Sequence, residues 1–198
     1  MFLPLWGRAV ESMKAHPMLV DKTALAIMQA VDIDFASIAK NVSEMSRVAW
    51  ITRCIIIDEA IRAFLVKYPQ GTIVNIGCGL DTTFERVDNG RLTWYDLDLP
   101  DVIALRRKFI QESGRRRFIA DSFLERDWPG HLEVKEQVFF FAAGVLFYFE
   151  EQEVREFLLR LADMFPGSEL LMDVCSLFGI KMANRMVINA AGWMSAPS

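Results

Sequence analysis

Two glycines followed at a distance by an acid are the residues of this sequence that best match a known kind of chemistry. The short β-branched run Thr72–Ile76 leads into Gly77-Cys78-Gly79-Leu80-Asp81-Thr82. Glycines let a backbone turn tightly and approach a ligand closely. An acid, Asp96 or Asp98, follows at the end of the next predicted strand, and Asp98 lies 21 positions after Gly77. A carboxylate there can accept hydrogen bonds from both ribose hydroxyls. The spacing predicts a nucleotide-type cofactor site, while the glycines alone also fit a plain strand-to-helix turn.

The residues of the loop favour one class of cofactor over another. Thr82 stands where a dinucleotide fingerprint has its third glycine, and Asp81 stands where a pyrophosphate would meet the helix N-terminus. A negative side chain there opposes a negative ligand. S-adenosylmethionine carries no phosphate and does carry an ammonium and a sulfonium group, so it suits this loop better.

The elements that position this loop follow from the apolar patterns. Five short apolar or β-branched runs predict strands, and periodic segments predict helices. The strands are 72–76, 92–97, 117–120, 138–142 and 169–174, and the helices are 8–15, 22–31, 46–66, 102–112, 150–165 and 179–191. This order predicts an α/β fold with a doubly wound, mostly parallel sheet (71–198) and an N-terminal helical cap (1–70). Ligands of such sheets lie at the carboxyl ends of the strands.

Composition limits the classes of protein. The chain has 198 residues, 53% apolar and 24% charged, with a net charge of −4, which is typical of a folded domain and argues against nucleic acid as a partner. The longest apolar run, Val138–Phe149, is shorter than the about 20 residues of a membrane helix. The apolar start Met1–Trp6 is interrupted by Pro4, and we expect no signal peptide and no membrane partner.

Cysteine and histidine usage points to a reducing compartment without a metal site. Cys54, Cys78 and Cys175 are odd in number and widely spaced, which predicts no disulfide framework and a cytoplasmic location. His16 and His131 are the two histidines. Both are expected at the surface, and we predict no metal.

Four motifs together resemble those of the leucine carboxyl methyltransferase family, which includes bacterial polyketide O-methyltransferases of the tetracenomycin type. Val74–Arg86 resembles its glycine loop, and Tyr95–Ile103 resembles its acid-Leu-Pro motif. Thr52–Asp58 resembles its upstream arginine motif, and Ala143–Phe149 the motif after its fourth strand. The resemblance implies a Rossmann-like methyltransferase sheet and S-adenosylmethionine as cofactor.

The resemblance also implies roles for individual residues. Arg53 would pair with the methionine carboxylate, or else form a surface salt bridge on its helix. Gly77 and Gly79 would lie against the methionine part of the cofactor. Asp98 would hold the ribose, unless it is a plain loop carboxylate before Pro100, and Asp96 would support the same turn.

Three further positions follow from the later motifs. Asp121 and the backbone of Ser122 would bind the adenine amino group, although Asp121 also fits a helix N-cap. Ala143 stands where the family often has Glu, so a carboxylate contact to the cofactor is lost unless another acid replaces it. Tyr148 would either contact the acceptor or pack between Phe147 and Phe149.

The resulting hypothesis is an S-adenosylmethionine-dependent O-methyltransferase acting on a hydroxyl or carboxyl group of a small molecule. A protein C-terminal carboxyl methyltransferase is the alternative within enzymes. A non-catalytic relative that binds a cofactor or partner is the alternative outside them, and Ala143 favours it slightly. No catalytic base is identified. An ionised carboxylate acceptor needs none, whereas a hydroxyl would benefit from one.

The length of the chain raises one further expectation. The family's sheet has strand order 3-2-1-4-5-7-6, and nothing after Ser176 shows the apolar pattern of the last two strands. The run 169–174 would then be an open apolar edge. We therefore expect a fragment or a shortened family member that self-associates through this edge as a homo-oligomer, or that lacks part of its acceptor pocket.

Overall fold

The computed structural model describes residues 1–40 and 42–174, which divide into two compact units. One contains Met1–Arg53 and the other Cys54–Asp173. The predicted boundary at residue 70 stays a prediction. Three predictions concern residues outside the described ones. They are the helix 179–191, the absence of a sixth and a seventh strand, and the position of Cys175.

The first unit is built from short helices. They are α1 (Phe2–Ser12), α2 (Lys22–Ala30), α3 (Phe35–Ala39) and the start of α4 (Glu44–Lys67). The buried Asp21 carboxylate caps α2 by accepting the Ala24 N–H at 2.8 Å and pairs with Arg8 of α1 at 2.9 Å. One carboxylate therefore fixes both the start of α2 and its attachment to α1.

The prediction for the first helix was wrong at both ends. The helix begins at Phe2 rather than at residue 8, because Pro4 lies in the first turn, where its missing N–H costs nothing. It ends at Ser12, whose hydroxyl donates to the Arg8 carbonyl at 2.8 Å and accepts the Asp21 N–H. The short helix α3 was not predicted from the sequence.

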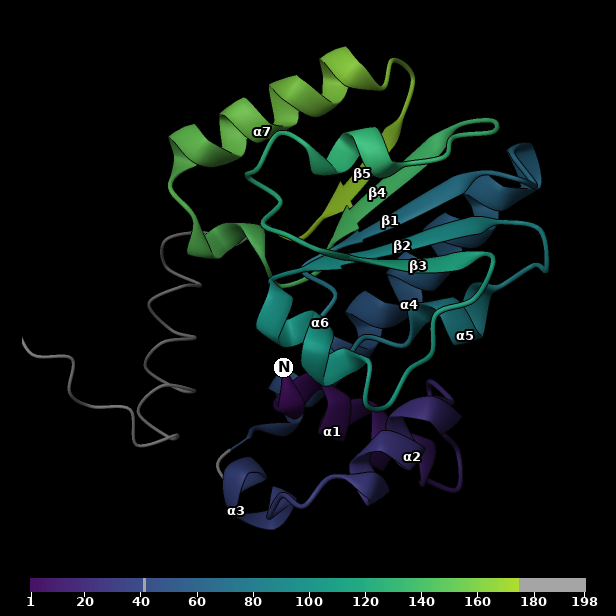
Figure 1. The fold of residues 1–198 in the computed structure, drawn as a ribbon. Helices are drawn as coiled ribbons and strands as arrows, with labels where there is room; N and C mark the ends of the chain where they lie inside the picture. Colours follow the sequence, from purple (N-terminus) through teal and green to yellow (C-terminus); the bar gives the residue numbers. More distant parts are fainter. Residues whose placement is uncertain (41, 175–198) are drawn as a thin grey trace, which may run out of the picture. The chain divides into compact units, whose positions relative to one another are not determined.

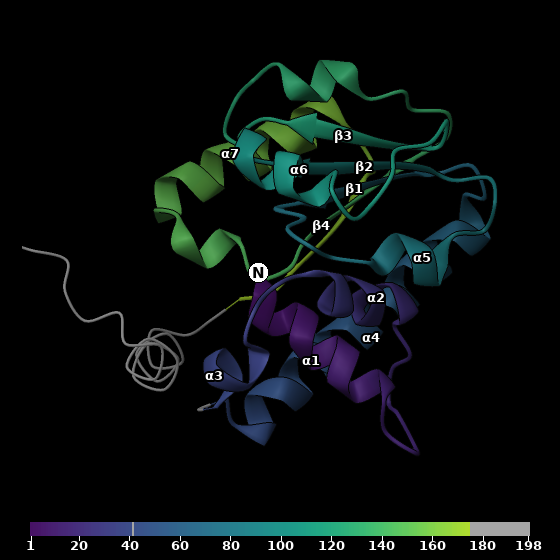
Figure 2. The ribbon, with the colours of Figure 1, turned by 60° about the horizontal axis from the view of Figure 1, so that its bottom comes forward.

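The second unit contains a five-stranded, all-parallel sheet of order β3-β2-β1-β4-β5 (Figures 1 and 2). Its strands are β1 (Thr72–Ile76), β2 (Thr93–Asp98), β3 (Arg116–Ala120), β4 (Val138–Ala142) and β5 (Glu169–Met172). The predicted α/β doubly wound fold is confirmed. The observed order equals the first part of the order expected from the family resemblance.

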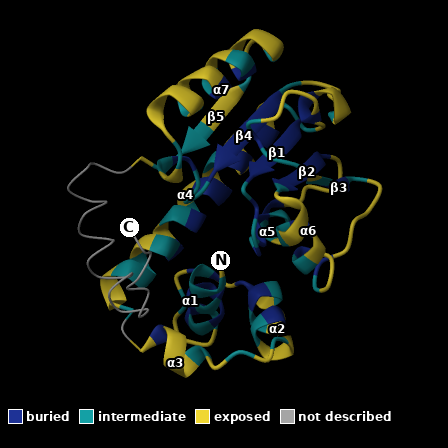
Figure 3. Cartoon of the chain, turned by 60° about the vertical axis from the view of Figure 1, so that its left-hand side comes forward, coloured by how far each residue is buried: buried dark blue, intermediate teal, exposed yellow. Residues whose placement is uncertain are grey.

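Alternate side chains of the strands build two cores, one on each face of the sheet. Phe140 on β4 packs with Phe157 and Leu161 of α7 (Glu151–Met164). Phe139 and Phe141 point the other way and pack with the second half of α4. Figure 1 shows α7 on one side of the sheet and α4 on the other, and Figure 3 shows the central strands β1 and β4 as buried. Both faces are covered, which explains why β1 and β4 are buried along their whole length.

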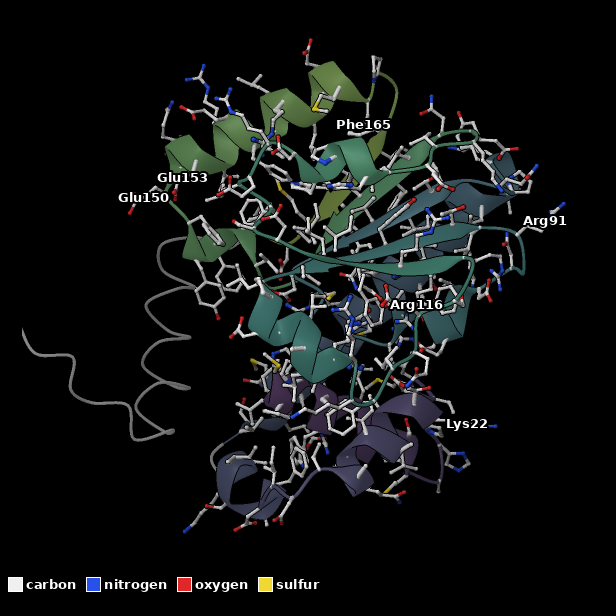
Figure 4. All side chains as sticks on the ribbon, in the orientation of Figure 1. Lys22, Arg91, Arg116, Glu150, Glu153 and Phe165 are labelled. Carbon is white, nitrogen blue, oxygen red and sulfur yellow. The ribbon has the colours of Figure 1, made fainter. Side chains whose placement is uncertain are left out.

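Capping defines the start of α7. The Glu150 side chain accepts an N–H of the first turn, and the Glu153 carboxylate accepts the Glu150 N–H at 3.0 Å. Both acids are labelled at this helix end in Figure 4. The acids at this end therefore form a capping box, and their negative charge also favours the N-terminal end of the helix dipole.

The helix predicted over 102–112 is shorter and begins earlier. It is α6 (Pro100–Arg106), and the chain after it bends through turn hydrogen bonds such as Lys108 N–H to the Leu105 carbonyl at 3.1 Å. Three short elements were not predicted. They are α5 (Thr83–Val87), η1 (Trp128–His131) and η2 (Leu146–Tyr148).

Within the described residues, β5 is an edge strand, and its Glu169 and Leu170 side chains are exposed. Self-association through this edge stays a prediction. No helix in residues 1–40 and 42–174 combines the length and the apolar character needed to cross a bilayer.

Removing a core ring should cost far more stability than trimming an exposed side chain. Phe140 is fully buried, so Phe140→Ala should lower the free energy of unfolding by about 3–5 kcal/mol. Leu159→Ala on α7, at 60% exposure, should change it by about 0.5 kcal/mol or less. Urea unfolding of both variants measures the difference, and equal losses would contradict the assigned core.

Candidate cofactor site

The glycine loop folds over the carboxyl end of β2. Gly77 and Gly79 both have positive φ, +66° and +47°. The Gly77 and Cys78 N–H groups donate to the Leu97 carbonyl at 2.8 and 3.2 Å. Burial raises the pKa of the Cys78 thiol well above its ordinary value, so Cys78 packs as a neutral side chain. The loop therefore presents backbone, not a nucleophile, at this end of the sheet.

Asp98 ends β2 beside this loop. Its Oδ2 accepts the Gly79 N–H at 2.7 Å, and its Oδ1 accepts the Leu99 N–H at 2.8 Å. Burial raises the pKa of Asp98, while these two N–H groups lower it. Each carboxylate oxygen has a second lone pair, and the side chain is partly exposed. Asp98 thus fits the predicted role of accepting two ribose hydroxyls.

Asp96, two residues earlier, has a different environment. It is fully buried and accepts hydrogen bonds at 2.9 Å from Arg106, Arg116 and Trp94, and one at 3.3 Å from Asn75. Figure 4 labels Arg116, which lies among other side chains that carry nitrogen and oxygen atoms. Because its lone pairs accept these hydrogen bonds, Asp96 holds β1, β2, β3 and α6 together from inside the fold. Its role in supporting the cofactor site stays a prediction.

Asp81 turns into the protein. Its carboxylate accepts the Thr83 N–H at 2.9 Å, the Thr83 hydroxyl at 3.1 Å and the Asn75 side chain at 3.2 Å. The acid thus occupies the N-terminal N–H of α5, which a cofactor phosphate would otherwise contact. The preference for a cofactor without a phosphate at this loop stays a prediction.

Asp121 and Ser122 follow β3 in a turn. The Ser122 N–H donates to the Asp121 carboxylate at 2.8 Å, and the Asp121 N–H donates to the Asp98 carbonyl at 3.0 Å. No helix starts at Asp121, so the N-cap alternative was wrong. Arg160 of α7 holds this turn by donating to the Phe123 and Leu124 carbonyls at 2.9 and 3.0 Å. The structure thus places Asp121 and Asp98 at the ends of neighbouring strands.

A carboxylate lies close to the end of β4, and it belongs to Asp173, the residue after β5. Ala142 pairs with Met172 of β5, which sets the residues after them side by side. Asp173 accepts the Gly144 N–H at 2.8 Å. Asp173 therefore anchors the loop next to Ala143, the position where the family often has Glu. No sequence pattern predicted this pairing.

Two predicted residues stay predictions. Arg53 is half-buried and belongs to the first unit, and its pairing with the methionine carboxylate stays a prediction. Tyr148 is 78% exposed, with its ring against Phe147 at 4.6 Å between centroids. It is available to an acceptor, and packing with Phe149 does not bury it.

The sequence analysis did not identify Arg106, which supports the glycine loop. Arg106 is fully buried and donates to the Gly79 carbonyl at 2.8 Å and to Asp96 at 2.9 Å. One available signal was its spacing, because Arg106 lies three residues after the buried Ile103, on the same helix face.

Comparison with known proteins gives a family match. The family described as leucine carboxyl methyltransferase matches residues 2–162. The tetracenomycin polyketide synthesis O-methyltransferase TcmP of Streptomyces glaucescens is 28% identical over 190 residues, covering 95% of this chain and 70% of that protein. The S-adenosyl-L-methionine-dependent methyltransferase dpfgK of Gibberella zeae is 25% identical over 185 residues, 85% of this chain and 61% of that protein.

Solved structures show the same fold. An O-methyltransferase family protein from Burkholderia thailandensis has a TM-score of 0.51 at 15% identity, covering 100% of this chain and 63% of that one. The N-methyltransferase NodS from Bradyrhizobium japonicum, in complex with S-adenosyl-L-homocysteine, has a TM-score of 0.51 at 16% identity, with coverages of 87% and 85%.

Two glycines with similar backbones should respond differently to a methyl group. Gly77 (φ +66°) and Gly90 (φ +77°) are both left-handed, but a Cβ at Gly77 would overlap the Val145 side chain, whereas one at Gly90 meets nothing within 4 Å. Gly90→Ala should cost about 1–2 kcal/mol for conformation alone. Gly77→Ala should cost about 1–3 kcal/mol more because of the overlap. Urea unfolding measures both, and equal costs would show that the loop does not pack against Val145.

Proposed function

Because the chain belongs to the leucine carboxyl methyltransferase family, we propose that it transfers a methyl group from S-adenosylmethionine to an oxygen atom of a small molecule. The family is S-adenosylmethionine-dependent. The observation that carries the proposal for this chain is Asp98, which ends β2 with its carboxylate bonded to the Gly79 N–H at 2.7 Å. The acid and the glycine loop are thus one structural unit.

The described residues fit the parts of this cofactor. Asp98 would accept the ribose hydroxyls, and the turn at Gly77 and Gly79 would lie against the methionine part. Asp121 would accept the adenine amino group through the oxygen that Ser122 leaves open, since the Ser122 N–H occupies Oδ1. Arg53 would pair with the methionine carboxylate.

The cofactor, when bound, supplies an electrophilic methyl group on a positive sulfur. The protein has to hold the acceptor oxygen in line with the methyl carbon and the sulfur. The new oxygen–carbon bond would replace the carbon–sulfur bond, whose electron pair would remain on the sulfur. An ionised carboxylate acceptor needs no base, whereas a hydroxyl must also lose its proton. Tyr148, exposed after β4, is the residue that we assign to acceptor contact.

A small-molecule acceptor is favoured by the relatives. TcmP is by name a polyketide O-methyltransferase, and the chain covers 70% of its length. The family's name keeps a protein C-terminal carboxylate as the second candidate. The alanine at 143 supports a third, a binding protein without turnover.

The proposal also includes the location of the protein and its partners. Cys54 and Cys78 are buried and are not joined in a disulfide within the part of the chain that the structure describes, which supports a reducing, cytoplasmic location. The exposed edge of β5 supports self-association with a second copy. The net charge of −4 argues against nucleic acid as a partner.

Cofactor binding should depend on Asp98. Asp98→Ala removes the ribose acceptor and should weaken S-adenosylhomocysteine binding by about 1–3 kcal/mol, the cost of losing a charged hydrogen-bond partner. Isothermal titration calorimetry measures the change. Asp101→Ala is the matched control, because Asp101 is an exposed acid in the same segment. An unchanged affinity in Asp98→Ala would show that another acid holds the ribose.

The acceptor class can be separated by labelled methyl transfer. We expect label from S-adenosylmethionine to reach a phenol or a small carboxylic acid in a mixed panel, and not a peptide with a C-terminal leucine. Transfer to the peptide alone would support the second candidate. Cofactor binding without any transfer would support the third. No binding of the cofactor at millimolar concentration would contradict the proposed enzyme.

A further inference from the structure

We propose that Arg106 is the positioning residue of the glycine loop, setting the Gly79 peptide and through it the ribose-binding carboxylate of Asp98. This inference rests on the proposed function, because it concerns the same cofactor site. It adds a residue that lies behind the loop. Arg106 is fully buried, so it acts through the backbone that it holds.

The Gly79 residue is bonded on both of its polar backbone groups. Its N–H donates to Asp98 Oδ2 at 2.7 Å, and its carbonyl accepts from Arg106 Nη1 at 2.8 Å. Gly79 has φ +47°, so no helix or strand ladder fixes its direction. Two side chains, Asp98 at the end of β2 and Arg106 in α6, therefore determine how this residue is oriented.

Arg106 is itself held in place. Its Nη2 donates to Asp96 Oδ2 at 2.9 Å, and its guanidinium lies over the Phe118 ring at 5.4 Å from the centroid. The buried Nε has no hydrogen-bond partner. The two terminal nitrogens of the guanidinium thus donate to Gly79 and Asp96, and the third nitrogen, Nε, makes no hydrogen bond. A planar fork can bridge two acceptors in this way, whereas an ammonium is a single point charge.

Arg116 provides an internal comparison. It is also buried, and its Nε donates to the same Asp96 oxygen at 2.9 Å. Its Nη1 bonds to Glu85 at 2.6 Å, and within the described residues it makes no bond to the glycine loop. The two arginines share one carboxylate, and only Arg106 extends from it to Gly79.

The two arginines should therefore separate stability from cofactor affinity. Arg106→Lys and Arg116→Lys both keep a positive charge near Asp96 and should both lower the melting temperature. Arg106→Lys should in addition weaken S-adenosylhomocysteine binding about tenfold, the effect of one charge-assisted hydrogen bond. Arg116→Lys should leave that affinity within about twofold. Calorimetric titration well below both melting temperatures measures the affinities.

The results that overturn the inference are distinct from a failure of the proposed function. Equal losses of affinity in the two lysine variants, or none in Arg106→Lys, would assign Arg106 a structural role only. Failure of the unchanged protein to bind would instead contradict the proposed function. Arg106→Gln is the second variant if the lysine variant does not fold, since its amide can still donate to one acceptor.

A double-mutant cycle tests the route through Gly79. If Arg106 acts by orienting the Gly79–Asp98 pair, the affinity loss caused by Arg106→Lys should shrink to less than threefold in an Asp98→Asn background. Hydrogen exchange of the peptide that spans 77–80 should accelerate in Arg106→Lys and not in Arg116→Lys. Additive affinity losses together with unchanged exchange would contradict the positioning role.

Discussion

The buried carboxylate of Asp96 is the interaction on which the second unit depends. A buried charge is costly unless it is paired and hydrogen-bonded. Asp96 receives two arginine donors on Oδ2 and the Trp94 and Asn75 side chains on Oδ1. These donors come from β1, β2, β3 and α6, so one carboxylate joins the elements that surround the cofactor site.

The same hydrogen-bond network connects the buried Asp96 to the residues of the cofactor site. Asn75 also donates to Asp81, which occupies the N–H at the start of α5. Arg106 continues from Asp96 to the Gly79 carbonyl, and the Gly79 N–H reaches Asp98. Gly79 and Asp98, which are proposed to touch the cofactor, are thus the outer layer of a hydrogen-bond network whose centre, Asp96, is fully buried.

The sequence predicted the elements that show a regular apolar pattern and the sharp turn that contains glycines. Apolar runs located the five strands within a few residues, and the glycine spacing located the loop beside Asp98. It did not predict Arg106 or Asp173, because each acts through a partner at least 27 positions away, at Gly79 and at Gly144. It also missed α3 and α5, which are too short for a periodic apolar pattern to develop.

A crystal structure of the complex with S-adenosylhomocysteine tests the central claim most directly. The account predicts that both ribose hydroxyls donate to Asp98 while its Oδ2 still accepts the Gly79 N–H and Arg106 still donates to the Gly79 carbonyl. A ligand bound away from the carboxyl end of β2, or a ribose held by another acid with the glycine loop rearranged, would contradict it.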